Sequence, residues 1–218
     1  EYVTDAAIVA LRSNGDVCEM KKFNCPKCGK TFEERLTDMI AKIGENMNLR
    51  RAKMIEVNDG VVASYIHNAA GTNIGKIGVL VALESKADKA KLAELGKHIA
   101  MHVAASNPLF LNVAAVDPAA VEHEKAIYSE QAKASGKPEN IIEKMVEGRV
   151  RKYYDEVVLE EQAYIMDPDK KVKQVVADTA KELGADIKIA DFACFKLGEG
   201  LQKKEEDFAA EVASQLNK

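Results

Sequence analysis

Four cysteines carry the most reactive side chains of this chain, and three of them lie close together. Cys25 and Cys28 enclose a Pro-Lys pair, Cys18 precedes them, and Cys194 stands far along the sequence. This spacing resembles half a zinc ribbon, but a structural zinc site needs four ligands. Four cysteines in so long a chain also make no disulfide scaffold. We therefore expect reduced thiols in a polar loop without metal; the alternative is a zinc-stabilised structural or interaction protein organised by Cys18, Cys25 and Cys28.

A glycine-rich segment, Gly71 to Ile77, has some likeness to a phosphate-binding loop. Three residues separate Gly71 from Gly75, where the P-loop has four, and Ile77 replaces the Ser or Thr that holds magnesium. The segment also precedes a predicted strand instead of following one and opening a helix. It is therefore interpreted as the loop of a hairpin, and a nucleotide-hydrolysing enzyme is disfavoured.

Two histidines, His98 and His102, are four positions apart and can share one face of a helix, as metal ligands do. No Glu follows His98 as in the metalloprotease pattern, and no third ligand is evident. We interpret them as ordinary surface or core histidines. Since no Ser/His/Asp or Cys/His arrangement is evident either, we predict no catalytic residue, no cofactor and no enzymatic activity.

The composition indicates a folded protein with a protein or small-molecule partner. Of 218 residues, 47% are hydrophobic and 30% charged, and 31 basic against 35 acidic residues give a net charge of -4. Charges of both signs are spread along the chain, which gives no reason to expect direct nucleic-acid binding. No apolar run approaches the roughly 20 residues that span a bilayer, so we expect no membrane contact and a cytoplasmic location.

The first half of the sequence predicts helices around a strand hairpin. A helix over residues 1–13 ends at Asn14-Gly15, and a second helix over 32–43 ends at Gly44. Residues 60–67 and 76–84 are rich in Val and Ile and read as antiparallel strands joined by a loop. An amphipathic helix follows and carries Leu92, Leu95, Ile99 and Val103.

Asp117-Pro118 opens a pair of helices, with Asp as N-cap and Pro at the first helical position. The short segment 135–138 between two apolar seams predicts that residues 117–158 fold back as an antiparallel helical hairpin. Because the seams are narrow and their flanks charged, we expect a coiled-coil arm that protrudes from the body.

The last part of the sequence predicts a helix, a strand and another helix. Asp167-Pro168 repeats the cap signal before a helix that Gly184 closes, and Ile187 to Leu197 fits a strand interrupted near its centre. The final helix carries Phe208, Val212 and Leu216. We therefore predict an α+β fold with small antiparallel sheets covered by helices.

Several long segments, in order, resemble the bacterial elongation factor Ts family. Apart from the first 30 or so residues, the resemblance covers the whole chain. The matching segments are Lys42-Ile-Gly-Glu-Asn-Met-Asn-Leu-Arg-Arg51, Ser64-Tyr-Ile-His67, Ile77-Gly-Val-Leu-Val81, Lys97-His-Ile-Ala-Met-His-Val-Ala-Ala-Ser106, Ser135-Gly-Lys-Pro138, Glu143-Lys-Met-Val-Glu-Gly-Arg149, Gly198-Glu-Gly200 and Asp207-Phe-Ala-Ala-Glu-Val212.

The resemblance implies a non-enzymatic guanine-nucleotide exchange factor for translation, whose partner is elongation factor Tu. In that family a two-part core and a helical hairpin grip the partner so that GDP leaves. The matching positions imply that Ile43 and Gly44 pack on the partner's nucleotide-binding domain and that His67 touches its third domain. They also imply a C-terminal contact near Ile165 and Met166, with the helix around Phe208 in a C-terminal module. Without the resemblance, core packing is the simpler interpretation of Ile43, Ile165 and Met166.

The resemblance also implies a division of the chain and two departures from the family pattern. The family's N-terminal helical domain and its Thr-Asp-Phe-Val segment are not among these residues, and we expect them to precede Glu1. The Cys25–Cys28 loop is foreign to the pattern. The expected units are 1–58 (remainder of the N-terminal half of the core), 59–116 (its C-terminal half), 117–158 (the arm), 159–200 (return to the C-terminal half) and 201–218 (the C-terminal helical module).

Overall fold

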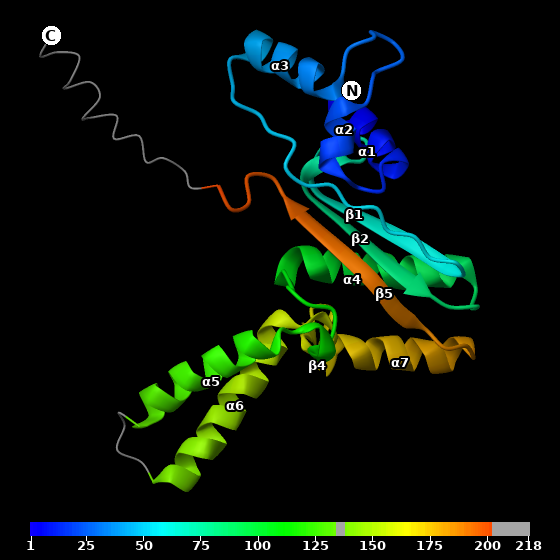
Figure 1. Cartoon of the computed structure of the whole chain (residues 1–218). Coiled ribbons are helices and arrows are strands. Elements are labelled where there is room, and N and C mark those ends of the chain that lie inside the picture. The colour runs from blue at the N-terminus through cyan, green and yellow to red at the C-terminus, as the bar shows by residue number, and fades with distance from the viewer. Residues whose placement is uncertain (134–137, 202–218) are drawn as a thin grey trace, which may run out of the picture.

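Helices and two small antiparallel sheets make up the structure, a computed structural model that describes residues 1–133 and 138–201 (Figure 1). This confirms the predicted α+β class. Within those two ranges no helix has the length and apolar character that a membrane crossing requires. In chain order the elements are α1 (Tyr2–Arg12), α2 (Val17–Lys22), α3 (Phe32–Ile43), β1 (Gly60–Gly71), β2 (Ile74–Glu84), α4 (Lys89–Ser106), η1 (Val113–Ala115), α5 (Pro118–Lys133), α6 (Glu139–Val157), η2 (Leu159–Glu161), β3 (Ala163–Tyr164), β4 (Asp167–Lys171), α7 (Val172–Leu183) and β5 (Lys188–Lys196).

The three N-terminal helices enclose a small core of their own, in which Met20 and Phe32 are each only 1% exposed. Helix α3 begins with a capping box, since Thr31 Oγ1 accepts the Glu34 N–H and the Glu34 carboxylate accepts the Thr31 N–H. The helix ends at Gly44, whose φ of 80° is left-handed. Both helices predicted here are present. Helix α2 was not predicted, because it is short and lies inside the segment interpreted as a loop.

Strands β1, β2 and β5 form an antiparallel sheet in that order, with β2 at the centre. The predicted hairpin is confirmed, but its strands are longer than predicted. β1 continues to Gly71 and β2 starts at Ile74, because backbone pairing extends over residues whose side chains carry no strand signal. The phosphate-loop likeness therefore falls on a tight hairpin turn. β5 has a register irregularity opposite Ala82/Leu83, in agreement with the predicted interruption.

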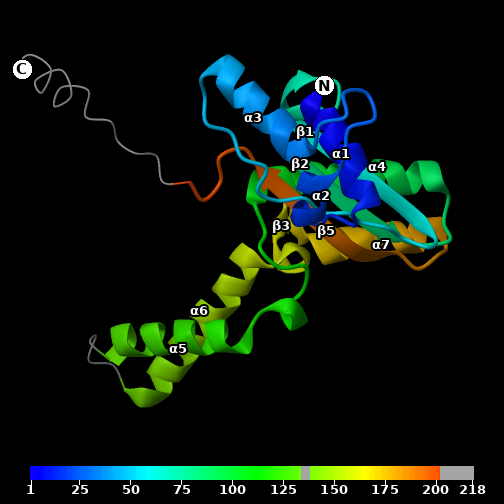
Figure 2. The same ribbon diagram turned by 45° about the horizontal axis from the view of Figure 1, so that its top comes forward.

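Helices α4 and α7 cover one face of this sheet and bury the main core against it (Figures 1 and 2). Gly96 of α4 makes the close packing possible. A Cβ atom at this position would lie 2.7 Å from the Ala63 Cβ of β1 and 3.4 Å from a methyl carbon of Leu83. The core residues with no more than 2% exposure are Val79, Val81, Leu83, Ile99, Ala100, Val103, Leu159, Val172 and Ile189.

Helices α5 and α6 lie side by side and away from the sheet, on the side opposite the N-terminal helices (Figures 1 and 2). Asp117 caps α5 as predicted, since its carboxylate accepts the Ala119 N–H at 2.9 Å. A separate apolar cluster joins the two helices and includes the buried Val121 and Val150, while the Arg149 guanidinium lies over the Tyr128 ring. Of the turn predicted at 135–138, only Pro138 lies within the described residues.

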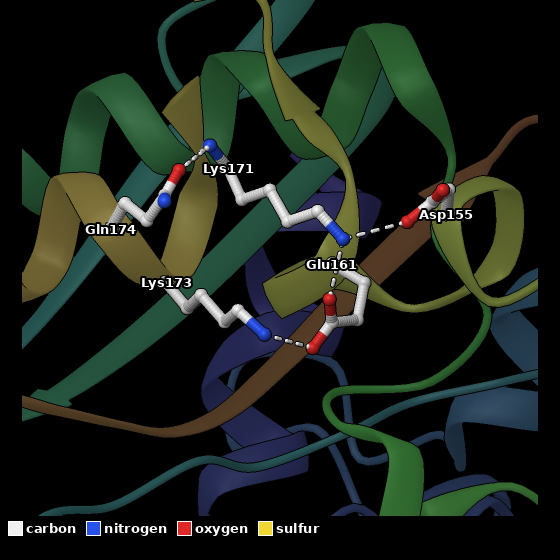
Figure 3. A network of polar contacts seen from close by, with 5 residues as sticks. All are labelled: Asp155, Glu161, Lys171, Lys173 and Gln174. Carbon is white, nitrogen blue, oxygen red and sulfur yellow. Dashed lines mark hydrogen bonds and ion pairs between the residues drawn. The ribbon is translucent and has the colours of Figure 1, made fainter. Parts of the chain in front are cut away.

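The base of this helical pair is fixed to the body in two ways. Residues entering α5 and leaving α6 pair through their backbones, with the Leu159 N–H donating to the Phe110 carbonyl at 2.8 Å. The Lys171 ammonium then joins Asp155 at the end of α6 (2.8 Å) to Glu161 of η2 (2.7 Å), and Lys173 also binds Glu161 (Figure 3).

One predicted cap is wrong. Asp167 does not begin a helix: residues 167–171 form β4, which pairs with β3, and α7 starts only at Val172. The chain must reverse after Tyr164, and pairing Tyr164 with Asp167 satisfies that turn; Pro168 is tolerated because an edge strand does not need its N–H. The helix predicted around Phe208 lies outside the described residues.

We expect Gly96→Ala to lower the free energy of unfolding by about 1–2 kcal/mol, because the added methyl overlaps the Cβ of Ala63 and forces α4 and β1 apart. Equilibrium urea unfolding followed by circular dichroism measures this change.

Gly148→Ala is the matched control, since nothing lies within 4 Å of a Cβ at this helical position of α6. It gains helix propensity and should stabilise by about 0.5–1 kcal/mol. A neutral or stabilising Gly96→Ala would contradict the close packing of α4 on β1.

We expect Lys171→Met to destabilise the protein by about 1–2 kcal/mol at pH 7, because Asp155 and the largely buried Glu161 both lose a charged donor. Hydrogen bonds from Lys171 and then Lys173 lower the pKa of Glu161. The stabilisation of the folded protein by the charged Glu161 is therefore present above about pH 4.3 and is lost as the pH falls through the lowered pKa. The difference in free energy of unfolding between the wild type and Lys171→Met should shrink in acid.

Lys170→Met is the control for this change. Lys170 pairs with Asp178 on the surface, where both side chains are about half exposed, and solvent screening leaves such a pair little effect on stability. Equal losses for the two variants at pH 7 would show that the Lys171 network does not fix α6 to the body.

Candidate functional site

An apolar groove of about 340 Å³ opens between strand β1, helix α4 and the turn that joins β3 to β4. It brings His67 next to the neighbouring pair Ile165 and Met166, which lies far along the sequence. Ile165 and Met166 are large apolar side chains, yet 49% and 47% of their surface is exposed. Exposed apolar clusters of this kind are typical of binding surfaces. The remaining lining residues are Tyr65, Ile77, Met101, Ala104 and Ala105.

The alternation of side chains along β1 places the two polar residues of the groove on the same face of the strand. Tyr65 and His67 are two positions apart on β1, so their side chains lie on the same face. The Tyr65 hydroxyl is 3.1 Å from His67 Nδ1, and the two rings are 6.1 Å apart. The His67 ring is thereby oriented at the rim of the groove while its residue stays exposed.

A buried histidine holds the Ile165–Met166 turn in place. His102 of α4 has no exposed surface, and its Nδ1 lies 3.2 Å from the Ile165 backbone nitrogen. That nitrogen can only donate, so Nδ1 accepts, and Nε2 carries the proton and donates to Gln162 Oε1 at 2.9 Å. Next to this turn, the Tyr164 hydroxyl lies 3.4 Å from the Met166 sulfur.

The network requires His102 to be neutral. Burial lowers the pKa of His102 below its ordinary value, and the hydrogen bond to Gln162 opposes this shift in part. Protonation of Nδ1 would place two N–H groups against each other and break the bond to Ile165. His102 is therefore the core histidine that the sequence allowed, and its four-residue spacing from His98 reflects no shared metal site.

The other predicted contact residues do not lie in the groove. Ile43 and Gly44 end α3 in the N-terminal unit, where Ile43 is 57% exposed and Gly44 has open space around its α-carbon. Phe208 lies outside the described residues. Among residues 1–133 and 138–201, no three His, Cys, Asp or Glu side chains gather as a metal site would require. Cys25 is buried, which the interpretation as a polar loop did not foresee.

Sequence reasoning missed the residues that position the groove. Gln162 carried no motif, and His102 was interpreted as an ordinary surface or core histidine without any positioning role. An available signal was a histidine in the middle of an apolar helical stripe, between Ile99 and Val103, because a buried imidazole needs partners for both nitrogens. The residues near His102 in the sequence do not indicate which groups those partners are.

We expect His102→Gln to destabilise the protein by about 1–3 kcal/mol at pH 7.5, because the Ile165 N–H or the Gln162 amide loses its partner. The pH dependence should change as well. The unfolded chain binds a proton on this histidine below about pH 6.5 while the folded protein resists it, so wild-type stability falls as the pH decreases from there to the lowered pKa. Thermal unfolding between pH 5 and 7.5 measures both effects.

The half-buried His98, one turn earlier on α4, serves as the control. His98→Gln should lose less stability at pH 7.5 than His102→Gln, and His102→Gln should flatten the wild-type slope of stability against pH. An unchanged slope in His102→Gln would show that this imidazole is not held neutral.

Comparison with known proteins identifies the family. The family model described as elongation factor TS matches residues 1–199. Elongation factor Ts of Sinorhizobium medicae (strain WSM419) is 52% identical over 214 residues, which cover 98% of this chain and 70% of the relative. The homologue of Paramagnetospirillum magneticum is 53% identical with 98% and 69% coverage, and that of Rhodospirillum rubrum is 52% identical with 100% and 71% coverage. The chain therefore belongs to the elongation factor Ts family of translation elongation factors.

Proposed function

We propose that this chain is a guanine-nucleotide exchange factor that binds elongation factor Tu in the cytoplasm and promotes the release of GDP. Family membership supports the assignment. The observation that carries the binding site is the convergence of His67, Ile165 and Met166 in one apolar groove, since the resemblance had assigned all three to the partner.

Exchange needs no covalent chemistry, and we propose none. A factor that binds nucleotide-free elongation factor Tu more tightly than the GDP-bound form weakens GDP binding by the same ratio. Contact surfaces suffice for this, and the groove is such a surface: apolar, partly exposed, and held by a buried network that resists deformation.

We propose that further contacts lie on separate units of the chain. Ile43 and Gly44, at the end of α3, are exposed and suited to pack on the nucleotide-binding domain of the partner, and Phe208 belongs to a C-terminal module. We also propose that α5 and α6 act as a coiled-coil arm, one of five units at 1–58, 59–116, 117–158, 159–200 and 201–218. Support for the arm comes from its separate apolar cluster and its anchored base.

We expect Ile165→Asp to weaken binding to elongation factor Tu at least tenfold, because a carboxylate in this apolar groove loses its water when the partner docks and the lining offers it no lysine or arginine. Stopped-flow release of fluorescent GDP, measured over a range of factor concentrations, shows the change as a shift in half-saturation. Ile165 is half exposed, so the fold should persist, and thermal unfolding checks this.

Leu109→Asp is the matched control, since Leu109 is 63% exposed and does not line the groove. This variant should accelerate the release of GDP from elongation factor Tu as much as the wild type does. Failure of the wild-type chain to accelerate release would contradict the proposed function. Acceleration that Ile165→Asp leaves unchanged would contradict only the groove.

A further inference from the structure

The two cysteines of the Cys25–Cys28 turn, between α2 and α3, are brought together by the backbone. The Cys28 N–H donates to the Cys25 carbonyl at 3.3 Å, and the Gly29 N–H donates to the same oxygen at 2.9 Å. A turn closed in this way brings its first and fourth α-carbons within about 7 Å. Disulfides span α-carbon separations of about 4.4–6.8 Å.

The flanking backbone keeps this turn closed. The Cys25 N–H donates to the Lys30 carbonyl at 2.8 Å, and Asn24 pairs with Thr31 in an antiparallel bridge. Both ends are also anchored, because Phe23 and Phe32 on either side pack in the N-terminal core. The two thiols are therefore held as neighbours in the folded protein.

The surroundings of Cys25 favour its thiolate. The Lys27 N–H donates to the sulfur and lowers the pKa of Cys25, burial opposes this, and the Cys28 thiol and N–H add further hydrogen bonds. The positive charge of Arg35 acts in the same direction. Among the described residues, Arg35 Nη1 is the one buried side-chain nitrogen or oxygen without a hydrogen-bond partner. The guanidinium can therefore donate a further hydrogen bond.

The number of available groups decides between a metal site and a redox pair. A tetrahedral metal site needs four ligands, and within the described residues not even three candidate ligands gather. A disulfide needs only two sulfurs. We propose that Cys25 and Cys28 form a reversible redox pair, oxidised to an intramolecular disulfide by a small-molecule disulfide such as oxidised glutathione.

The reaction proceeds by two exchanges. Cys28 is exposed while Cys25 is buried, so the Cys28 thiolate attacks a sulfur of oxidised glutathione, forms a mixed disulfide and releases one glutathione thiolate. The Cys25 thiolate then attacks the Cys28 sulfur, which forms the internal disulfide and releases the second glutathione. The protein loses two protons and two electrons, and glutathione disulfide gains them as two thiols.

The full chain, equilibrated in glutathione buffers of increasing oxidised fraction, tests the proposal. After an acid quench, remaining thiols are alkylated and the peptides are identified by mass spectrometry. We expect one disulfide between Cys25 and Cys28, with a loss of about 2 Da for the two thiol hydrogens. Because the second exchange is intramolecular, the Cys25–Cys28 disulfide should be fully formed in buffers where less than about a tenth of Cys18 carries glutathione. Cys18 is the comparison because it is an exposed thiol outside the turn.

Variants separate the two steps. Cys28→Ser, at an exposed position, should abolish the disulfide without loss of fold and leave the buried Cys25 unmodified. Cys25→Ser should stop at the mixed disulfide on Cys28, and Cys18→Ser should behave as wild type. Glutathione on Cys28 of the wild type without an internal bond would overturn the proposal, as would zinc bound stoichiometrically through these thiols in the purified protein.

Discussion

The buried hydrogen bond between His102 and Gln162 is the interaction on which the arrangement of the second half of the molecule depends. The Gln162 amide also donates to the Glu156 and Ser106 carbonyls, at 2.7 and 3.4 Å, and its backbone carbonyl accepts the Val172 N–H. This one residue thus ties together the ends of α4 and α6 and the beginning of α7. Both side chains are buried, where an unpaired polar group is costly, so breaking either hydrogen bond would destabilise the network.

The same hydrogen-bonded histidine stabilises the fold and positions the candidate binding groove. The imidazole that bonds Gln162 also bonds the backbone of Ile165, so the residue that joins the helices fixes the lip of the apolar groove. Under the proposed exchange function, the groove has to keep its own shape in order to favour one state of the partner over another. The ion pairs of Lys171 with Asp155 and Glu161 separately hold the base of α6 against η2 and β4.

The N-terminal unit is stabilised by different interactions. Its core is small, and it relies on capping and on the cation Arg35, which pairs with Asp5 at 2.8 Å and lies over the rings of Tyr2 and Phe32. The cysteine turn lies within this unit, away from the residues that line the groove. Redox chemistry at Cys25 and Cys28 would therefore act on the connection before α3 and leave the groove unchanged.

The sequence by itself determined what depends on near neighbours. Helical periodicity and end signals located α1, α3, α4, α5 and α6, with Asp117 and Gly44 as predicted ends, because helix formation is decided by residues three or four positions apart. Two short segments rich in Val and Ile located the hairpin, and the resemblance supplied the family. Tertiary structure decided the rest: β4 in place of a cap at Asp167, the meeting of His67 with Ile165, and the partnership of His102 with a glutamine sixty positions away. Those contacts depend on how α4 and the β3–β4 turn pack in space, and no local pattern encodes which buried donor will find which acceptor.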